Sequence, residues 1–191
     1  MIITLTGPSG IGKGYVACEL KKHLPSLREL VWLTTRSLRP GEENRANRKS
    51  VSREEFLILA KIGSLALVQE LYGNLYGLKL TGVNYDQGLW ICELHIDNLQ
   101  QAREIDLPIF SIALVPNEVA FLDVRLRSYR ETKDESEIVK RLSVAEQEIS
   151  KIAQNRAFFD AFFEVTAENE HWIVDNVIET LRQLQGGKTT R

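Results

Sequence analysis

The chain has 191 residues, a length that suits one α/β domain better than two and that allows a real hydrophobic core. Hydrophobic residues make up 43% and charged residues 26%, which argues against gross disorder. The formal net charge of −2 gives no long-range attraction to nucleic acid or to an anionic membrane, so we expect neither partner.

Cysteine and histidine usage points to a reduced, metal-poor protein. Cys18 and Cys92 lie far apart without CxxC or Cys/His spacing, which is typical of reduced core thiols. The histidines are scattered, so no zinc site is predicted. The apolar N-terminal run is too short for a signal peptide, and no apolar stretch reaches the roughly 18 residues of a membrane span. We therefore expect a cytoplasmic protein, and the sequence leaves monomer and homodimer equally open.

The first half of the chain begins with a strand and a helix. Residues 2–6 are a short β-branched run that predicts a buried strand, and the helical pattern after it stops at Pro25. Residues 27–33 are a second apolar run, and residues 34–50 are polar and arginine-rich. Ser52 and Glu55 form a capping box that predicts a helix through Ala60. We expect a strand at residues 65–68 and a loop over residues 71–88.

The second half alternates strands and helices. Buried strands are predicted at residues 90–92 and 109–115, and a helix runs from about residue 118 toward residue 128. Residues 125–133 are charged and are expected to be irregular. A long helix from about Asp134 follows, then a strand at residues 162–166 and a helix at residues 172–184. This alternation predicts an α/β fold with a mostly parallel sheet covered by helices on both faces.

The main functional motif lies where the first strand meets the first helix. Its glycines let the backbone curl so that several N–H groups point at one anion, and the helix N-terminus adds positive charge. Lys13 can reach the β and γ phosphates of a nucleotide, as in a Walker A loop (P-loop). Gly14 stands where most P-loops have the Ser or Thr that binds Mg²⁺. We predict that ATP binds residues of this loop and its flank: Gly7, Pro8, Ser9, Gly10, Ile11, Gly12, Lys13, Gly14 and Tyr15.

Further motifs in the same order along the chain resemble those of the guanylate kinase family. The family's GPSGxGK loop matches residues 7–13, its TTRxxRPGE signature residues 34–42, its VSREEF helix start residues 51–56, and its GNxYG turn residues 73–77. Arginines of the family's lid and following helix match Arg125, Arg130 and Arg141. The resemblance covers nearly the whole chain.

The resemblance implies a P-loop kinase fold with three parts. These are an ATP-binding core (residues 1–33, 89–124 and 142–191), a small acceptor-binding subdomain (residues 34–88) and a lid (residues 125–141). It implies transfer of a phosphoryl group from ATP, with Mg²⁺, to a small phosphorylated acceptor, for which GMP or dGMP is favoured.

Site roles follow from the resemblance in the same way. Arg36 and Arg39 would bind the acceptor phosphate as planar forks, within a site that also includes Thr35, Arg48 and Tyr76. Lys13, Arg36, Arg125, Arg130 and Arg141 are the expected catalytic residues. Glu93 occupies the Walker B position and would hold a Mg²⁺-bound water.

The acceptor side departs from the family pattern. Guanylate kinases read guanine with carboxylates and small hydroxyl residues, but this chain has Trp32, Leu67, Leu78 and His95 at the corresponding positions. The family's GxDYxF segment is replaced by residues 45–50, so that Arg48 stands in place of a phosphate-binding tyrosine.

Two alternatives therefore stay open beside a nucleoside monophosphate kinase. One is a kinase similar to the ribose bisphosphate phosphokinases. Those enzymes lack the second arginine of TTRxxRPGE, whereas this chain has it as Arg39. The other is a non-catalytic guanylate kinase-like binding module, against which the intact phosphate loop argues.

Overall fold

The computed structural model describes residues 1–38, 43, 47–71, 73–84, 87–129, 134–169 and 172–186. In chain order the elements are β1 Ile2–Thr6, α1 Lys13–His23, β2 Leu27–Glu29, β3 Val31–Thr34, β4 Arg48–Ser50, α2 Arg53–Lys61, β5 Leu65–Leu71, β6 Asn74–Lys79, β7 Leu89–Glu93, α3 Ile96–Glu104, β8 Ile109–Pro116, α4 Val119–Tyr129, α5 Glu135–Gln154, a 3-10 turn Arg156–Phe158, β9 Ala161–Val165 and α6 Ile173–Gly186.

Five parallel strands form the core sheet in the order β2-β7-β1-β8-β9. β1 is the central strand, and all five of its residues are buried because side chains on both faces pack against helices. The register pairs Leu5 with Glu93, so the end of β1 and the end of β7 lie side by side. Because carboxyl ends of parallel strands share one edge, the phosphate loop and Glu93 meet there.

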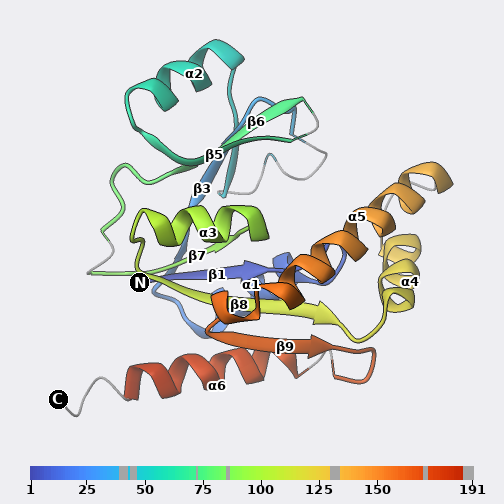
Figure 1. Cartoon of the computed structure of the whole chain (residues 1–191). Helices are drawn as coiled ribbons and strands as arrows, with labels where there is room; N and C mark the ends of the chain where they lie inside the picture. Colours follow the sequence, from blue (N-terminus) through green and yellow to red (C-terminus); the bar gives the residue numbers. More distant parts are fainter. Residues whose placement is uncertain are drawn as a thin grey trace.

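A second, smaller sheet has the order β4-β3-β6-β5. β6 pairs antiparallel with both β3 and β5, whereas β3 and β4 are parallel. α2 packs against β5 and β6, and Phe56 of this helix is fully buried beneath the sheet. Figure 1 shows this sheet and α2 standing above the core sheet, with α3 between the two.

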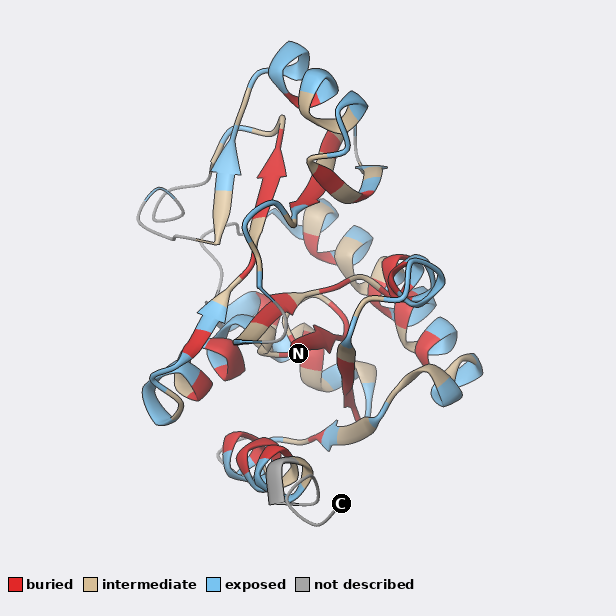
Figure 2. Ribbon diagram, turned by 90° about the vertical axis from the view of Figure 1, so that its left-hand side faces the viewer, coloured by how far each residue is buried: buried red, intermediate tan, exposed pale blue. Residues whose placement is uncertain are grey.

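Helices cover both faces of the core sheet (Figure 1). Alternate side chains of β1 separate the two layers: Ile3 and Leu5 pack with α1 and α6, whereas Ile2 packs with α3 and the second sheet. Figure 2 shows the buried residues gathered in the strands and on the helix faces turned toward them. The predicted α/β fold with a parallel core sheet flanked by helices is confirmed, and the structure adds a separate small mixed sheet.

Several local predictions are confirmed. Ser52 caps α2, its hydroxyl accepting from the Glu55 N–H at 3.0 Å, as the capping box requires. The apolar stripe of the long helix faces the core, where Ile138, Ala145 and Ile152 are buried. No helix within the described residues is long and apolar enough to cross a bilayer.

Other predictions are wrong. Residues 71–88, expected to be a loop, contain strand β6. The mixed composition of this segment gave no strand signal, because the strand forms through pairing with β3 on one side and β5 on the other. Residues 125–129 continue helix α4, in which Leu126 is buried, Arg127 is exposed and the half-buried Arg125 donates to the Gly10 carbonyl. The apolar run at residues 27–33, for which no single element was predicted, divides at Leu30 into β2 and β3, which belong to different sheets.

Two further points differ from the sequence-based expectation. Helix α3 was not expected, although Ile96, Leu99 and Ala102 recur every three residues and are buried. Both cysteines are free thiols, but only Cys92 is in the core, where burial raises the pKa of its thiol to about 12. Cys18 is exposed on α1, so its prediction as a core thiol is wrong.

Candidate active site

The phosphate loop connects β1 to α1 and depends on glycine at two positions for different reasons. A Cβ on Gly7 would lie 2.1 Å from the Leu114 carbonyl oxygen of β8, so the loop passes too close to the sheet for any side chain. Gly12 caps α1 with a left-handed φ of 107°, a conformation that other residues adopt only with strain. The loop is therefore pressed onto the sheet edge and opens directly into the helix N-terminus.

Lys13 lies over this loop. Its Nζ donates to the Gly7 carbonyl at 2.5 Å and to the Pro8 carbonyl at 3.1 Å. These bonds hold the cation beside the loop backbone, where a polyphosphate would bind. Tyr15 is two residues further along α1, a little over half a turn, and is more than half exposed.

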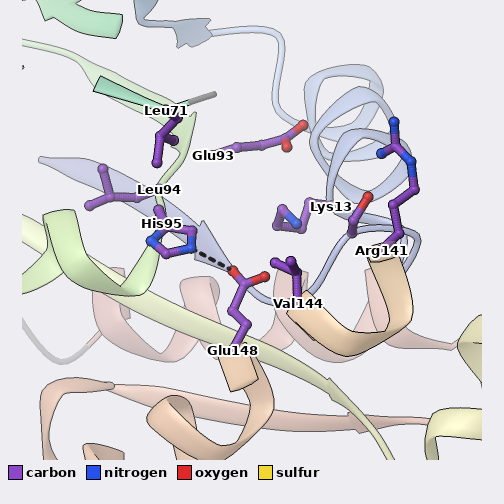
Figure 3. Close-up of a pocket in the computed structure, with 9 residues that line it drawn as sticks. Lys13, Leu71, Glu93, Leu94, His95, Arg141, Val144 and Glu148 are labelled. Atoms are coloured by element: carbon purple, nitrogen blue, oxygen red, sulfur yellow. Dashed lines mark ion pairs between the residues drawn. The ribbon is translucent and has the colours of Figure 1, made fainter. Parts of the chain in front are cut away.

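A cavity of about 300 Å³ adjoins the loop. It lies between the phosphate loop, the end of β7 and helix α5 (Figure 3). Its lining residues are Ser9, Lys13, Leu71, Glu93, Leu94, His95, Arg141, Val144 and Glu148. The structure thus brings together four residues predicted from the sequence: Ser9, Lys13, Glu93 and Arg141.

Glu93 ends β7 beside the first turn of α1. Its Oε1 is 3.3 Å from the point that a Cβ on Gly14 would occupy, so carboxylate and glycine are in contact distance of each other. Mg²⁺ in kinase sites uses one or two carboxylates, substrate phosphates and several waters. One carboxylate facing a phosphate loop fits that donor set. The described residues contain no preformed cluster of three metal-ligating side chains.

Two titratable groups face each other in the same cavity. His95 Nε2 is 3.7 Å from Glu148 Oε1, and Figure 3 shows the two side chains meeting from the end of β7 and from α5. Burial raises the pKa of Glu148 to about 7, although the Lys13 cation opposes this shift. Burial also lowers the pKa of His95, partly offset by the carboxylate of Asp97.

The lid arginines occupy two places. Arg141 lies at the rim of the cavity and donates through Nε to Glu137 Oε1 at 2.8 Å, one turn earlier on α5. Arg125 donates through Nε to the Gly10 carbonyl at 3.0 Å and lies over the Phe121 ring. Arg125 lines another cavity, formed with residues 117–121 and 166–168 on the far flank of the loop.

The acceptor-side residues lie on the second sheet. Thr35 and Leu75 are joined by two hydrogen bonds. The Thr35 N–H donates to the Leu75 carbonyl at 3.0 Å, and the Leu75 N–H donates to the Thr35 hydroxyl at 2.9 Å. Arg36 donates to the Ser37 carbonyl at 2.7 Å. Tyr76 is half-buried in β6 opposite Thr34. Arg48 lies in β4 and lines a separate cavity between this sheet and α2. Arg39 and Arg130 lie outside the described residues.

Three of the four positions expected to read the acceptor base form an apolar cluster, and the fourth is His95. Trp32 is 8%, Leu67 2% and Leu78 1% exposed, and all three pack with Leu94. Leu67 has a left-handed φ of 53° at a β-bulge, so the backbone turns its side chain inward. These side chains offer a hydrophobic wall instead of hydrogen bonds.

Glu148 is the residue that sequence reasoning missed. It lies seven residues after Arg141, two turns along the same face of α5, and between the buried Ala145 and Ile152. A carboxylate at a position whose helical period predicts burial is a signal that could have identified it. The sequence indicated His95 only as a residue at one of the family's guanine-reading positions.

Comparisons with known proteins agree with this geometry. The family model described as guanylate kinase matches residues 1–185. Guanylate kinase of Synechococcus sp. is 35% identical over 153 residues, covering 78% of this chain and 82% of that protein. Guanylate kinase of Prochlorococcus marinus is 33% identical over 184 residues, covering 95% and 96%. The crystal structure of guanylate kinase from Anaplasma phagocytophilum superimposes with a TM-score of 0.74 at 26% identity, covering 97% of this chain and 86% of that one. The chain therefore belongs to the guanylate kinase family of P-loop nucleoside monophosphate kinases.

Proposed function

We propose that this protein transfers the γ-phosphoryl group of ATP to GMP, yielding ADP and GDP. The observation that carries the proposal is the cavity in which Lys13 of the phosphate loop, Glu93 of β7 and Arg141 of α5 converge. Phosphoryl transfer needs positioning and charge neutralisation more than covalent chemistry, and this arrangement supplies both.

In the proposed reaction, a phosphate oxygen of GMP attacks the γ-phosphorus, and the bond from that phosphorus to the β–γ bridging oxygen breaks. Loop N–H groups and Lys13 would bind the β and γ phosphates. Arg141 would exchange Glu137 for the transferring group, because a guanidinium binds phosphate oxygens in the same fork geometry as a carboxylate. Arg125, tied to the Gly10 carbonyl, would hold the other flank of the ATP site, with Arg130 as a further lid cation.

Mg²⁺ would neutralise charge on the β and γ phosphates when bound with ATP. Glu93 is the carboxylate that would hold it, through a water, since the Gly14 position has no hydroxyl to offer.

On the acceptor side, Arg36 and Arg39 would bind the GMP phosphate, with Thr35, Tyr76 and Arg48 supporting that subsite. Thr35 supports it by fixing the loop backbone, because its hydroxyl and N–H are both bonded to Leu75. We place the reaction in the cytoplasm, where the two free thiols would remain reduced.

A second candidate acceptor is a sugar bisphosphate. It is favoured by the apolar burial of Trp32, Leu67 and Leu78, which removes the expected base-reading contacts from the second sheet. A sugar bisphosphate has no base edge and would not need those contacts.

The test is ADP release from Mg-ATP with purified protein and a panel of GMP, dGMP, AMP, CMP, UMP and ribose 1,5-bisphosphate. GMP and dGMP are expected to give the highest kcat/KM. Turnover on the bisphosphate alone would establish the second candidate in their place. ATP binding without turnover on any acceptor would indicate a binding module.

A further inference from the structure

His95 and Glu148 have polar side chains that could hydrogen-bond a ligand and that have no role in the proposed phosphoryl transfer. The two residues come from different elements, the N-cap of α3 and the middle of α5, and both line the cavity (Figure 3). Glu148 is 9% exposed, so its carboxylate has little access to water except through that cavity. A buried carboxylate without a full set of donors is costly unless a ligand supplies them.

Local hydrogen bonding fixes which atoms the pair presents. The Asp97 N–H donates to His95 Nδ1 at 3.4 Å, while the Asp97 carboxylate oxygen Oδ2 is 3.5 Å from the same nitrogen. We assign Nδ1 as an acceptor on the basis of that hydrogen bond. The proton of the neutral imidazole is therefore assigned to Nε2, the nitrogen that faces Glu148. The cavity wall thus offers an N–H donor next to a carboxylate acceptor, 3.7 Å apart.

Guanine has the complementary edge. Its O6 accepts, while its N1–H and 2-amino group donate, in that order along one side of the base. Adenine presents the opposite order, a 6-amino donor next to an N1 acceptor. Leu71, Leu94 and Val144 line the same cavity and provide apolar surface for a base.

We propose that the His95–Glu148 pair reads the guanine base of the acceptor: His95 Nε2–H donates to O6, and the Glu148 carboxylate accepts from N1–H and the 2-amino group. The pair would replace, from the N-cap of α3 and from α5, the polar contacts that Trp32, Leu67 and Leu78 cannot make. This inference rests on the proposed function, because it assigns specificity within the same acceptor site. Burial, which raises the pKa of Glu148 to about 7, is consistent with a carboxylate that gains donors only when ligand binds.

The experiment measures kcat/KM for GMP, inosine monophosphate and AMP, together with KM for ATP. Inosine monophosphate keeps O6 and N1–H but lacks the 2-amino group. The proteins are wild type, Glu148→Gln, His95→Asn and the control Glu146→Gln, which changes an exposed carboxylate on the same helix. Asn is chosen at position 95 because it preserves the N-cap while removing the imidazole.

Wild type should prefer GMP to inosine monophosphate and inosine monophosphate to AMP. Glu148→Gln should reduce the GMP preference over inosine monophosphate about 10-fold or more, with KM for ATP unchanged. His95→Asn should weaken both oxo-purines together and leave their ratio unchanged, since both carry O6. Glu146→Gln should match wild type throughout.

An unchanged ratio of GMP to inosine monophosphate in Glu148→Gln would overturn the inference, as would an equal loss with every acceptor and with ATP. Failure of the inference is distinct from failure of the proposed function. If wild type phosphorylates GMP but the ratio of GMP to inosine monophosphate is unchanged in Glu148→Gln, only the base-reading role of Glu148 is ruled out and the proposed function stands. If Glu148→Gln does not fold, Glu148→Asp, which shortens the side chain by one methylene, takes its place. A ratio of kcat/KM for GMP to kcat/KM for inosine monophosphate equal to that of wild type in Glu148→Asp would then contradict the proposal.

Discussion

Lys13 is the one charged residue of the phosphate loop (residues 7–14), and its Nζ donates to two loop carbonyls. Lys13→Ala should lower kcat about 100- to 1,000-fold, because one preorganised charge on the transferring group is lost. The fold should persist, since the lysine side chain is not part of the core. Steady-state kinetics and thermal unfolding check this, with Lys22→Ala on the exposed side of α1 as control. Wild-type kcat in Lys13→Ala would contradict the phosphate-loop assignment.

The ionised form of the buried Glu148 carboxylate destabilises the folded protein, so the free energy of unfolding depends on pH. Burial raises its pKa from 4.5 to about 7, opposed by the cations of Lys13 and Lys151 and reinforced by Asp97, while His95 faces it across the cavity. The folded state therefore holds this proton more tightly than the unfolded state, and the free energy of unfolding falls as pH rises from 4.5 to 7.

Replacing Glu148 with Gln removes that cost. Glu148→Gln should be more stable than wild type at pH 8, by up to on the order of 3 kcal/mol, and should show no such gain at pH 4.5. Urea unfolding at both pH values measures the difference, with Glu146→Gln as control. An equal effect of the substitution at both pH values would show that ionisation of Glu148 is not the cause.

At the scale of elements, helix α3 joins the second sheet to the core. The buried Asn98 Nδ2 donates to the Leu67 carbonyl at 3.2 Å, at the β-bulge of β5. Because Leu67 has a left-handed backbone there, this bond supports a conformation that the chain adopts only with strain. The contact ties the second sheet to helix α3 of the core.

Asn98→Ala should destabilise the protein by about 1–2 kcal/mol. It should also raise KM for GMP more than KM for ATP, because the acceptor sheet loses its anchor and the phosphate loop does not. Chemical denaturation and two-substrate kinetics measure both effects, and Gln100→Ala, on the exposed face of the same helix, is the control. Parallel changes in both KM values would contradict a selective anchoring role.

At the scale of the whole molecule, local patterns predicted most of the core and little of the acceptor side. β1, the phosphate loop and the α5 stripe were predictable because each follows from short-range periodicity or glycine spacing. β6 was not predicted because its pairing with β3 and β5 is a tertiary property. Glu148 was missed for the same reason, since its role depends on His95, 53 positions earlier in the sequence.

The most direct measurement follows the label from γ-³²P-ATP in the presence of GMP and Mg²⁺. We expect the label to appear in the β-phosphate of GDP, Lys13→Ala to slow this transfer about 100- to 1,000-fold, and AMP in place of GMP to accept little label. Label that stays in ATP or is released only as inorganic phosphate would contradict the proposal that this family member is a GMP kinase.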